Sequence, residues 1–378
     1  MALLTRKRTV LAKIETSYGV DPNPAGSADA ILVKNLNLTP LNAETVSRDL
    51  IRPYLGNSET LLATSSASID FEVEIAGSGA TGKLPGYDCL LRACGFEATT
   101  ITEEIDIERV GQVATATLAA HGFSNGDRVK ISGAGETEYN GEFEVYGVTA
   151  NTFDFTVVGT PATPATGTPV VGKRIEYKPV SEGIESVTLH FHIDSVRHVL
   201  AGARGTVEFS ISARQIPVMR FTFTGLYSTP TDTPAPTADF SKFQLPQVAN
   251  TQFTTNFSLH GYAGVLESMS LNLANDVQYL SRIGQENVLI LNRQPAGTFL
   301  IEAPTIATKD FFTLARNATP GLMTITQGTV GGNKVKIEAG SVTLQNPSYQ
   351  DTDGVHFLSI PFTAQPVSGN DEIVLTVF

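Results

Sequence analysis

A strict alternation of apolar and polar residues is the feature that most constrains this fold. In residues 69–75 four apolar residues alternate with three acids, and 187–193 and 206–212 repeat the same period. Successive side chains of a β-strand point to opposite faces, so each segment predicts a strand with one buried and one wet face. Further strands are expected at 219–224, 257–259, 341–344, 357–363 and 373–378. The chain is therefore predicted to be mainly β, folded as β-sandwich or β-barrel domains.

Helical signals are few. Residues 85–95 have a proline at the start and a glycine at the end, which is the usual asymmetry of a short helix. Residues 308–317 predict a second helix, with Thr308 as its N-cap and Pro320 beyond its end. We expect these short helices to flank the β-sheets.

Composition divides the chain into three parts. A Pro- and Thr-rich stretch at 229–236 predicts an extended linker between domains. Within the segment 106–172, Asn-Gly pairs at 125–126 and 140–141 predict hairpin turns between short strands. We expect a first domain formed by residues 1–105 and 173–236, a small inserted β domain at 106–172, and a second domain at 237–378.

The first and second domains share a faint internal repeat. Four blocks recur in the same order: 36–38 and 271–273, 88–93 and 310–315, 205–207 and 340–342, and 223–224 and 362–363. Similar sequence blocks that recur in a fixed order are typical of a duplicated domain. Chance similarity between two β domains is the alternative.

The net charge and the share of charged residues restrict the classes of partner and of fold that are expected. A net charge of −12 argues against a protein that grips nucleic acid, because such binding needs Lys and Arg on the phosphates. Charged residues amount to only 17%, which argues against a disordered chain or a coiled coil. Cys89 and Cys94 are expected to be reduced thiols of a core, in a protein made inside a cell. No targeting signal or membrane span is predicted.

Three motifs suggest chemistry, and each has a simpler explanation. Residues 77–83 fit the phosphate-binding pattern G-x-x-x-x-G-K, but Leu84 stands where a Mg²⁺-binding hydroxyl is needed. His190 and His192 could bind zinc, yet without a ligand cluster we predict histidines on a wet sheet face. Residues 351–354 resemble a calcium loop without its closing glutamate, so a hairpin turn is expected. We predict no catalytic residues, no metal site and no cofactor.

Blocks of residues in a fixed order resemble the tail tube (major tail) proteins of long-tailed, siphovirus-type bacteriophages. The blocks are 8–22, 77–96 and, in pieces, 177–227. Residues 121–127, 139–141 and 151–153 are similar to small β modules found in phage virion proteins. The resemblance covers about 1–105 and 173–236, whereas 237–378 match the motifs poorly and depend on the internal repeat.

The resemblance implies a structural virion protein and not an enzyme. In that family, β-sandwich domains with a flanking helix form stacked rings, and their inner strands join into one β-barrel around the DNA channel. The implied partners are further copies of the chain, a tape measure protein, and tail terminator and distal tail proteins. Genomic DNA would pass through without specific binding. The protein is expected in the virion tail, and in the host cytoplasm during assembly, without a membrane. The alternatives are a monomeric adhesin or glycan-binding β module and, least favoured, an enzyme.

Two sets of residues are expected to serve the tube. Asp70, Glu72 and Glu74 would line the channel, where negative walls let DNA slide without capture. Residues 42–64 are expected to form a long loop or hairpin that grips the next subunit or ring, with 277–298 as its counterpart. The contact residues are Arg48, Asp49, Leu50, Ile51, Arg52, Tyr54 and Leu55, with Arg282, Glu286 and Arg293 in the second half. A hairpin folded back on its own domain is the alternative.

The duplication bears on stoichiometry. The resemblance implies that tube proteins with a single domain form rings of six subunits. Three chains with two tube domains each would supply the same six domains. We expect a homotrimeric, pseudo-six-fold ring, stacked into the tube. The alternative is a true hexamer in which 237–378 decorate the outside. The insert is expected to project outward and to be dispensable for polymerisation, since inserted domains are tolerated at exposed loop tips.

Overall fold

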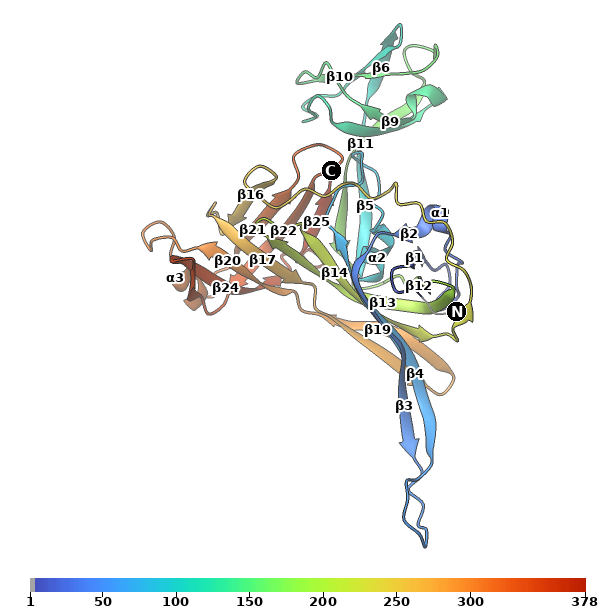
Figure 1. The fold of residues 1–378 in the computed structure, drawn as a ribbon. Helices are drawn as coiled ribbons and strands as arrows, with labels where there is room; N and C mark the ends of the chain where they lie inside the picture. The colour runs from blue at the N-terminus through green and yellow to red at the C-terminus, as the bar shows by residue number, and fades with distance from the viewer. Residues whose placement is uncertain (1–3) are drawn as a thin grey trace.

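The computed structural model describes residues 4–378, and β-strands dominate it (Figure 1). Strands account for 53% of the chain and helices for 5%, which confirms the mainly β prediction. Helices α2 (Asp88–Ala93) and α3 (Phe311–Arg316) are short, as expected, and α1 (Gly26–Asp29) is a single turn. No helix within residues 4–378 has both the length and the apolar character needed to cross a membrane.

The start of α3 corrects one sequence expectation. Its N-cap is Asp310 and not Thr308, because the Asp310 carboxylate accepts a hydrogen bond from the Thr313 N–H at 2.9 Å. Thr308 lies in the preceding turn, where its N–H donates to the carbonyl of Thr305. A carboxylate suits a helix N-terminus better than a hydroxyl does, since it also interacts favourably with the helix dipole.

The two halves of the chain have sheets with the same order of strands. The first half runs β3 (Lys34–Ser47), β4 (Thr60–Glu74), β14 (Val218–Tyr227), β13 (Val196–Ser212), β12 (Val187–Ile193), β1 (Arg8–Ile14). The second half runs β17 (Leu266–Asn272), β20 (Ala296–Glu302), β24 (Val355–Gln365), β22 (Val335–Leu344), β21 (Gly321–Gln327), β16 (Thr254–Leu259). In each half a short helix follows the second of these strands. Two copies of one domain would produce this shared order.

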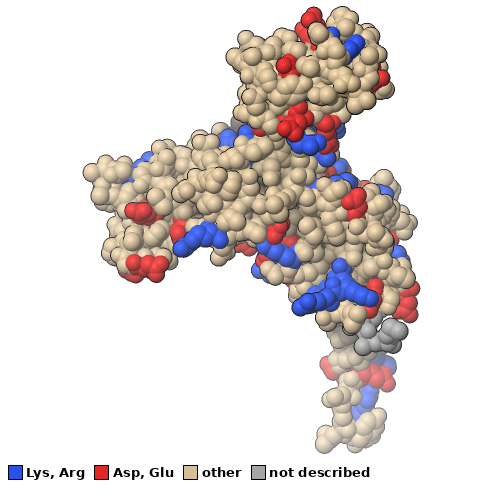
Figure 2. Space-filling model, turned by 45° about the horizontal axis from the view of Figure 1, so that its top comes forward, with Lys and Arg blue, Asp and Glu red and all other residues tan. Residues whose placement is uncertain are grey.

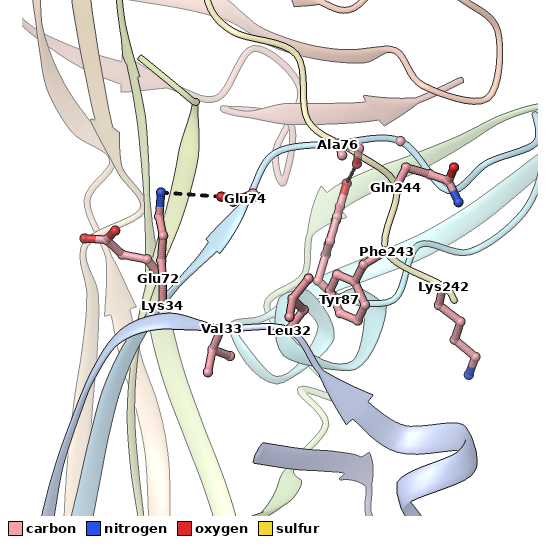
Figure 3. A pocket seen from close by; sticks show the side chains of 11 residues that line it. Leu32, Val33, Lys34, Glu72, Glu74, Ala76, Tyr87, Lys242, Phe243 and Gln244 are labelled. Carbon is pink, nitrogen blue, oxygen red and sulfur yellow. Dashed lines mark hydrogen bonds and ion pairs between the residues drawn. The ribbon is translucent and has the colours of Figure 1, made fainter. Parts of the chain in front are cut away.

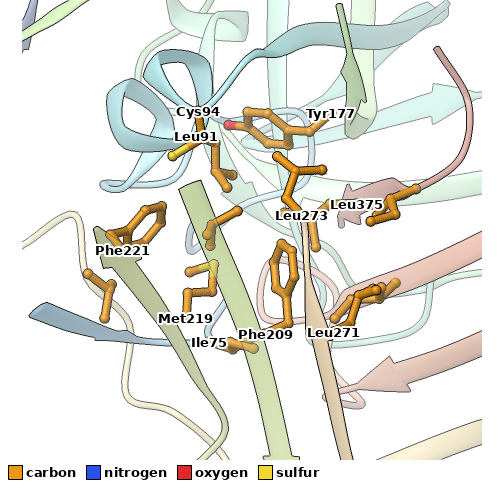
Figure 4. Close-up of a cluster of buried hydrophobic side chains, with 14 of the residues drawn as sticks. Ile75, Leu91, Cys94, Tyr177, Phe209, Met219, Phe221, Leu271, Leu273 and Leu375 are labelled. Carbon is orange, nitrogen blue, oxygen red and sulfur yellow. The ribbon is translucent and has the colours of Figure 1, made fainter. Parts of the chain in front are cut away.

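The two sheets are joined through β13. Residues 208–212 of β13 pair with β17, on the same edge that β12 occupies earlier along the strand. A second joint forms where β11 (Gly167–Pro179) pairs with β25 (Val374–Val377). Side chains of both halves share one core, in which Leu271 and Leu375 of the second half pack near Phe209 of the first (Figure 4).

The insert has a hydrophobic core of its own, and Figure 1 shows it standing at the opposite end of the molecule from the β3–β4 hairpin. Its three-stranded sheet comprises β6 (Asp106–Val110), β7 (Val113–Thr117) and β10 (Thr152–Thr156). β8 (Arg128–Ala134) pairs with β9 (Gly141–Glu144) and with β11, and β5 (Phe96–Glu104) pairs with β11. The chain therefore enters and leaves the insert along two paired strands.

Neither Asn-Gly pair of the insert closes the two-residue hairpin that the sequence indicated. Asn125 and Gly126 form a turn between β7 and β8, which belong to different sheets. Gly141 already begins β9, and the Asn140 amide bridges back to the N–H and carbonyl of Ala134 at 3.0 and 2.9 Å. Asn140 thus orders a longer connection in place of forming a tight turn.

Candidate assembly surfaces

One continuous sheet with a polar face runs through both halves of the molecule. Its strands are β3, β4, β14, β13, β17, β20, β24 and β22 in spatial order. One face packs on the core, and the other presents mostly hydroxyl and amide side chains. Residues on the polar face include Asn37, Ser68, Thr222, Thr206, Ser210, Ser270, Thr298, Ser359 and Thr363. Charged side chains stand among them, with Glu208 of β13 opposite Arg220 of β14, so the face is wettable and carries charges of both signs.

The acidic stripe predicted from the sequence lies on this polar face. Asp70, Glu72 and Glu74 are half-buried and alternate with the core residues of β4. Arg220 of β14 lies 3.2 Å from the Asp70 carboxylate, and Lys34 lies 3.8 Å from that of Glu74. Two of the three carboxylates therefore have a cationic neighbour, which reduces the negative charge of the stripe.

The continuous sheet ends in free edges. Within residues 4–378, β3 pairs with β4 on one edge and has no strand on its other edge. At the far end, β21 accompanies β22 only as far as the pair of Gly321 with Val342, and no described strand continues along that edge. Unpaired edges expose backbone N–H and C=O groups that can bind another strand.

The β3–β4 hairpin projects from the body, and its outer part makes no fold-back onto its own domain (Figures 1 and 2). Ile51 and Leu55 at its tip are 104% and 102% exposed. Arg48 pairs across the hairpin with Glu59 at 2.8 Å, and Arg52 lies over the ring of Tyr54. Asp49 and Leu50 are also exposed. The predicted contact residues of the first half thus lie together at the tip, where exposed apolar side chains indicate a partner.

The second hairpin, β18 (Asn275–Arg282) with β19 (Gln285–Arg293), packs on the first half of its own chain. Val288 is fully buried there; its N–H donates to the Tyr18 hydroxyl at 2.5 Å, and its carbonyl accepts from Arg204 at 2.6 Å. Arg282 and Glu286 are exposed near the tip. Arg293, by contrast, forms an ion pair with Glu372 and donates to the Val180 carbonyl, so its contacts lie within the chain.

The Gly-rich loop at 77–83 forms a junction of three parts of the chain. The Thr81 N–H donates to the Arg128 carbonyl of the insert, and the Gly79 N–H donates to the Gly332 carbonyl of the second half. The Gly77 N–H donates to the side chain of Asn333 at 2.8 Å. The N–H groups of Gly77, Gly79 and Thr81 are thus occupied by protein oxygens, so this loop serves packing. Sequence reasoning did not indicate Asn333, which carries no local signal.

His190 and His192 correct the prediction of a wet face for β12. They are only 3% and 2% exposed, because the N-terminal loop and the linker cover them. His190 Nε2 lies 2.8 Å from the Asp21 carboxylate, and His192 Nδ1 lies 3.3 Å from the Thr233 carbonyl. Burial lowers the pKa of both imidazoles from 6.5. Their ring nitrogens thus meet protein partners on different segments and do not converge on a common point.

The remaining sequence motifs have structural explanations. Asp353 and Gly354 turn β23 (Ser348–Thr352) back into β24, as predicted, and both have positive φ. The two cysteines are free thiols, and burial raises the pKa of Cys89 to about 12 and that of Cys94 well above its ordinary value. A thiol with a raised pKa is a poor nucleophile at neutral pH.

A cavity of about 210 Å³ lies at the start of β3, between the first domain and residues 242–244, which follow the linker (Figure 3). The Tyr87 hydroxyl donates to the Ala76 carbonyl at its wall, and Lys34 faces Glu74 across it. Phe243, in the segment that follows the linker, closes one side. These polar groups already have partners within the protein, so we interpret the cavity as a packing gap beside the free edge of β3.

The fold and these surfaces define a class of protein: a β-sandwich subunit whose sheet, edges and hairpin are arranged for association with other chains. A family model described as phage tail tube protein matches residues 5–377. The chain therefore belongs to the phage tail tube protein family and is a structural component of the virion tail. The match extends over 237–378, which the sequence motifs had covered poorly. A comparison with curated proteins gives no significant match.

Proposed function

We propose that this protein polymerises into stacked rings that form the phage tail tube, the channel through which DNA reaches the host. The observation that carries the proposal is the continuous sheet with one polar face and a free edge at each end. Such a sheet can close only by pairing with other copies, and closure into a barrel removes every edge. The polar face would then line the channel.

The shared strand order supports a ring of three chains. Each chain contributes two sheets of the same order, already joined at β13 and β17. Three chains then supply six such sheets, which equals the number of tube domains in the rings that the family resemblance implies. We therefore propose a homotrimeric, pseudo-six-fold ring. The alternative, a hexamer with the second half outside, does not use the joint between the two sheets.

Channel lining by Asp70, Glu72 and Glu74 follows from their place on the polar face. Carboxylates repel phosphates, and hydroxyl side chains offer DNA no strong binding site. Arg220 and Lys34 moderate this charge, which leaves a weakly negative wall. DNA would slide along such a wall without being held.

The β3–β4 hairpin is proposed as the contact to the next subunit or ring. Ile51 and Leu55 at its tip are fully exposed, so neither side chain packs inside the subunit. Arg282 and Glu286 of the second hairpin would contribute further contacts, while Arg293 would support that hairpin from within. The insert is proposed to project outward from the tube. Tape measure, tail terminator and distal tail proteins are the further partners, with assembly in the host cytoplasm.

Electron microscopy of the purified protein tests the proposal. We expect tubes or stacked rings, and a cross-section with three chains per turn of the ring. The polar face should line the lumen, with Asp70 and Glu72 pointing inward. Particles that stay monomeric at high concentration would favour the adhesin alternative. Six chains per ring would overturn the trimer but leave the tube intact.

A further inference from the structure

We propose that the cleft between the insert and the second half binds a small ligand with two or more phosphate groups, and that this ligand clamps the insert to the body. The cleft has a volume of about 520 Å³ and lies where Figure 1 shows the insert meeting the body at β11. Such a volume is typical of small-molecule sites. The inference does not depend on ring formation, because the site lies within one chain.

The two walls of the cleft belong to different parts of the chain. One wall comes from residues 121–123 of the insert and from Lys173 and Arg174 of β11. The Lys173 ammonium donates to the carbonyl of His121, which fixes this wall. The other wall comes from the second half and includes Lys334 and Lys336, at the start of β22. A ligand in the cleft would therefore contact the insert and the second half at once.

Positive charge gathers on these walls, although the whole chain has a net charge of −12. Three of the cations form ion pairs with glutamates that do not line the cleft: Lys173 with Glu103, Arg174 with Glu176, and Lys336 with Glu338. Lys334 forms no ion pair with any carboxylate of residues 4–378. The cleft itself thus presents more cations than anions.

Two carboxylates on the walls reduce this excess without removing it. Asp127 accepts hydrogen bonds from the N–H groups of Ser124 and Gly331, at 2.9 and 2.7 Å, so its oxygens are already occupied. The terminal carboxylate of Phe378 would oppose an anion, but it forms no ion pair within the described part of the chain. The cations outnumber these two groups.

An unpartnered hydroxyl on the second-half wall also points to a ligand. Thr324 Oγ1 is buried and has no hydrogen-bond partner within residues 4–378. Buried polar groups of proteins nearly always have a partner. Thr326 and Asn256 add a second hydroxyl and an amide to the same wall. These groups can donate hydrogen bonds to the oxygens of an anion.

The kind of cation favours phosphate over carboxylate. Lysine binds phosphate as a point charge, whereas the fork of an arginine matches a carboxylate best. The one arginine of the cleft, Arg174, already directs its Nε to Glu176 at 2.7 Å. The cleft is also much larger than a single phosphate group, so a ligand that meets both walls needs at least two.

Binding would fix the position of the insert. Like charges on the two walls repel each other, whereas a polyanion between them attracts both. A ligand that binds only the docked arrangement stabilises it. The Gly331 N–H, which donates to Asp127 of the insert, reports on this arrangement. We expect its hydrogen exchange to slow when the ligand is present.

Titration with inorganic pyrophosphate tests the site. Calorimetry at constant ionic strength keeps general screening the same throughout. Lys334→Met should raise the dissociation constant about tenfold, since a charged partner is lost. Arg316→Met is the matched control, because it removes one positive charge from an exposed position of α3, outside the cleft. No binding to the wild type, or equal dissociation constants for the two variants, would overturn the site.

Thr324→Val separates binding from folding. The hydroxyl has no protein partner, so the melting temperature without ligand should not fall, whereas the affinity for pyrophosphate should. A variant that melts lower but binds like the wild type would show that the hydroxyl supports the fold and not a ligand. Citrate should bind clearly more weakly than pyrophosphate, and equal binding would overturn the choice of phosphate. Tube formation is scored separately by electron microscopy, so a failure of the proposed function is distinguishable from a failure of this site.

Discussion

The Asp127 carboxylate of the insert accepts a hydrogen bond from the Gly331 N–H of the second half, with 2.7 Å between Oδ1 and N. Its other oxygen accepts from the Ser124 N–H at 2.9 Å, and the side chain is only 4% exposed. The insert is therefore not attached by its two connecting strands alone. It is also fixed to the second half, above the Gly-rich loop.

Removal of this carboxylate should loosen the attachment. Asp127→Ala leaves the Ser124 and Gly331 N–H groups without their acceptor, so we expect a loss of about 1–3 kcal/mol in the free energy of unfolding. Urea denaturation of the monomer measures it. Glu144→Ala changes an exposed carboxylate of the same insert and should alter stability by less than about 0.5 kcal/mol. Equal effects of the two substitutions would show that Asp127 does not fix the insert.

The close approach of Gly82 and Gly172 gives a second test. Gly82 has a φ of 72°, and a Cβ added there would lie 2.4 Å from the Cα of Gly172. Gly111 has a similar φ of 65° but open space around its Cα. Gly111→Ala should therefore cost only the backbone strain of about 1 kcal/mol, whereas Gly82→Ala should cost clearly more. Similar melting temperatures for the two variants would contradict the tight packing.

Polar substitutions at the hairpin tip should separate folding from assembly. Ile51→Asp with Leu55→Asp changes two fully exposed side chains, so the melting temperature of the monomer should stay the same while tube formation is lost. Charge reversal at Arg48 and Arg52 should weaken assembly in the same way. Val110→Asp, at an 85% exposed position of the insert, is the matched control and should assemble normally. Normal tubes from the double aspartate variant would rule out the hairpin as a contact.

Buried histidines should make the subunit less stable in mild acid. Burial lowers the pKa of His190 and His192 from 6.5, and Arg197 adds to the effect, although Asp21 partly opposes it at His190. The unfolded chain gains protons as the pH falls through 6.5, whereas the folded chain gains them only at lower pH, because its histidine pKa values are lowered. The stabilisation is thus complete above that pH and declines below it, by at most about 1.4 kcal/mol per pH unit for each histidine.

Thermal melting between about pH 7.5 and about pH 5.5 measures this dependence, because carboxylates of ordinary pKa stay ionised in that window. The His192→Gln variant should show a smaller drop in melting temperature than the wild type. An unchanged slope would show that the imidazole does not stay neutral in the fold.

The insert itself should be dispensable for the tube. Deletion of 106–172 with a short Gly/Ser bridge removes neither a free sheet edge nor the β3–β4 hairpin. We expect the shortened chain to polymerise, with reduced stability because Thr81 and Gly331 lose their partners. Electron microscopy and a melting curve give the two readouts. A deletion variant that folds but never polymerises would show that the insert takes part in ring contacts.

Much of the fold could be predicted from residues close together in the chain. The alternation in 69–75 marks β4 and places Asp70, Glu72 and Glu74 on one face, because side chains of a strand alternate whatever the strand packs against. The connection at 42–64 was predicted to be a long loop or hairpin at an interface from its mixture of charged and apolar residues. Asp353 and Gly354 defined a turn through their tolerance of positive φ. These features depend on local covalent geometry.

The remaining features were decided by contacts between distant segments. The sequence of β12 alternates, yet both of its faces are buried, since the loop around Asp21 and the linker around Thr233 happen to cover the polar one. Asp127 finds its partner 204 residues away, and no local pattern marks either Gly331 or Asn333. Which strand pairs with β13 beyond Ala203 likewise depends on which sheet edges come together in the fold. Alternation by itself determined which residues form strands, whereas burial and hydrogen-bond partners depend on which elements meet, and only the tertiary structure settles that.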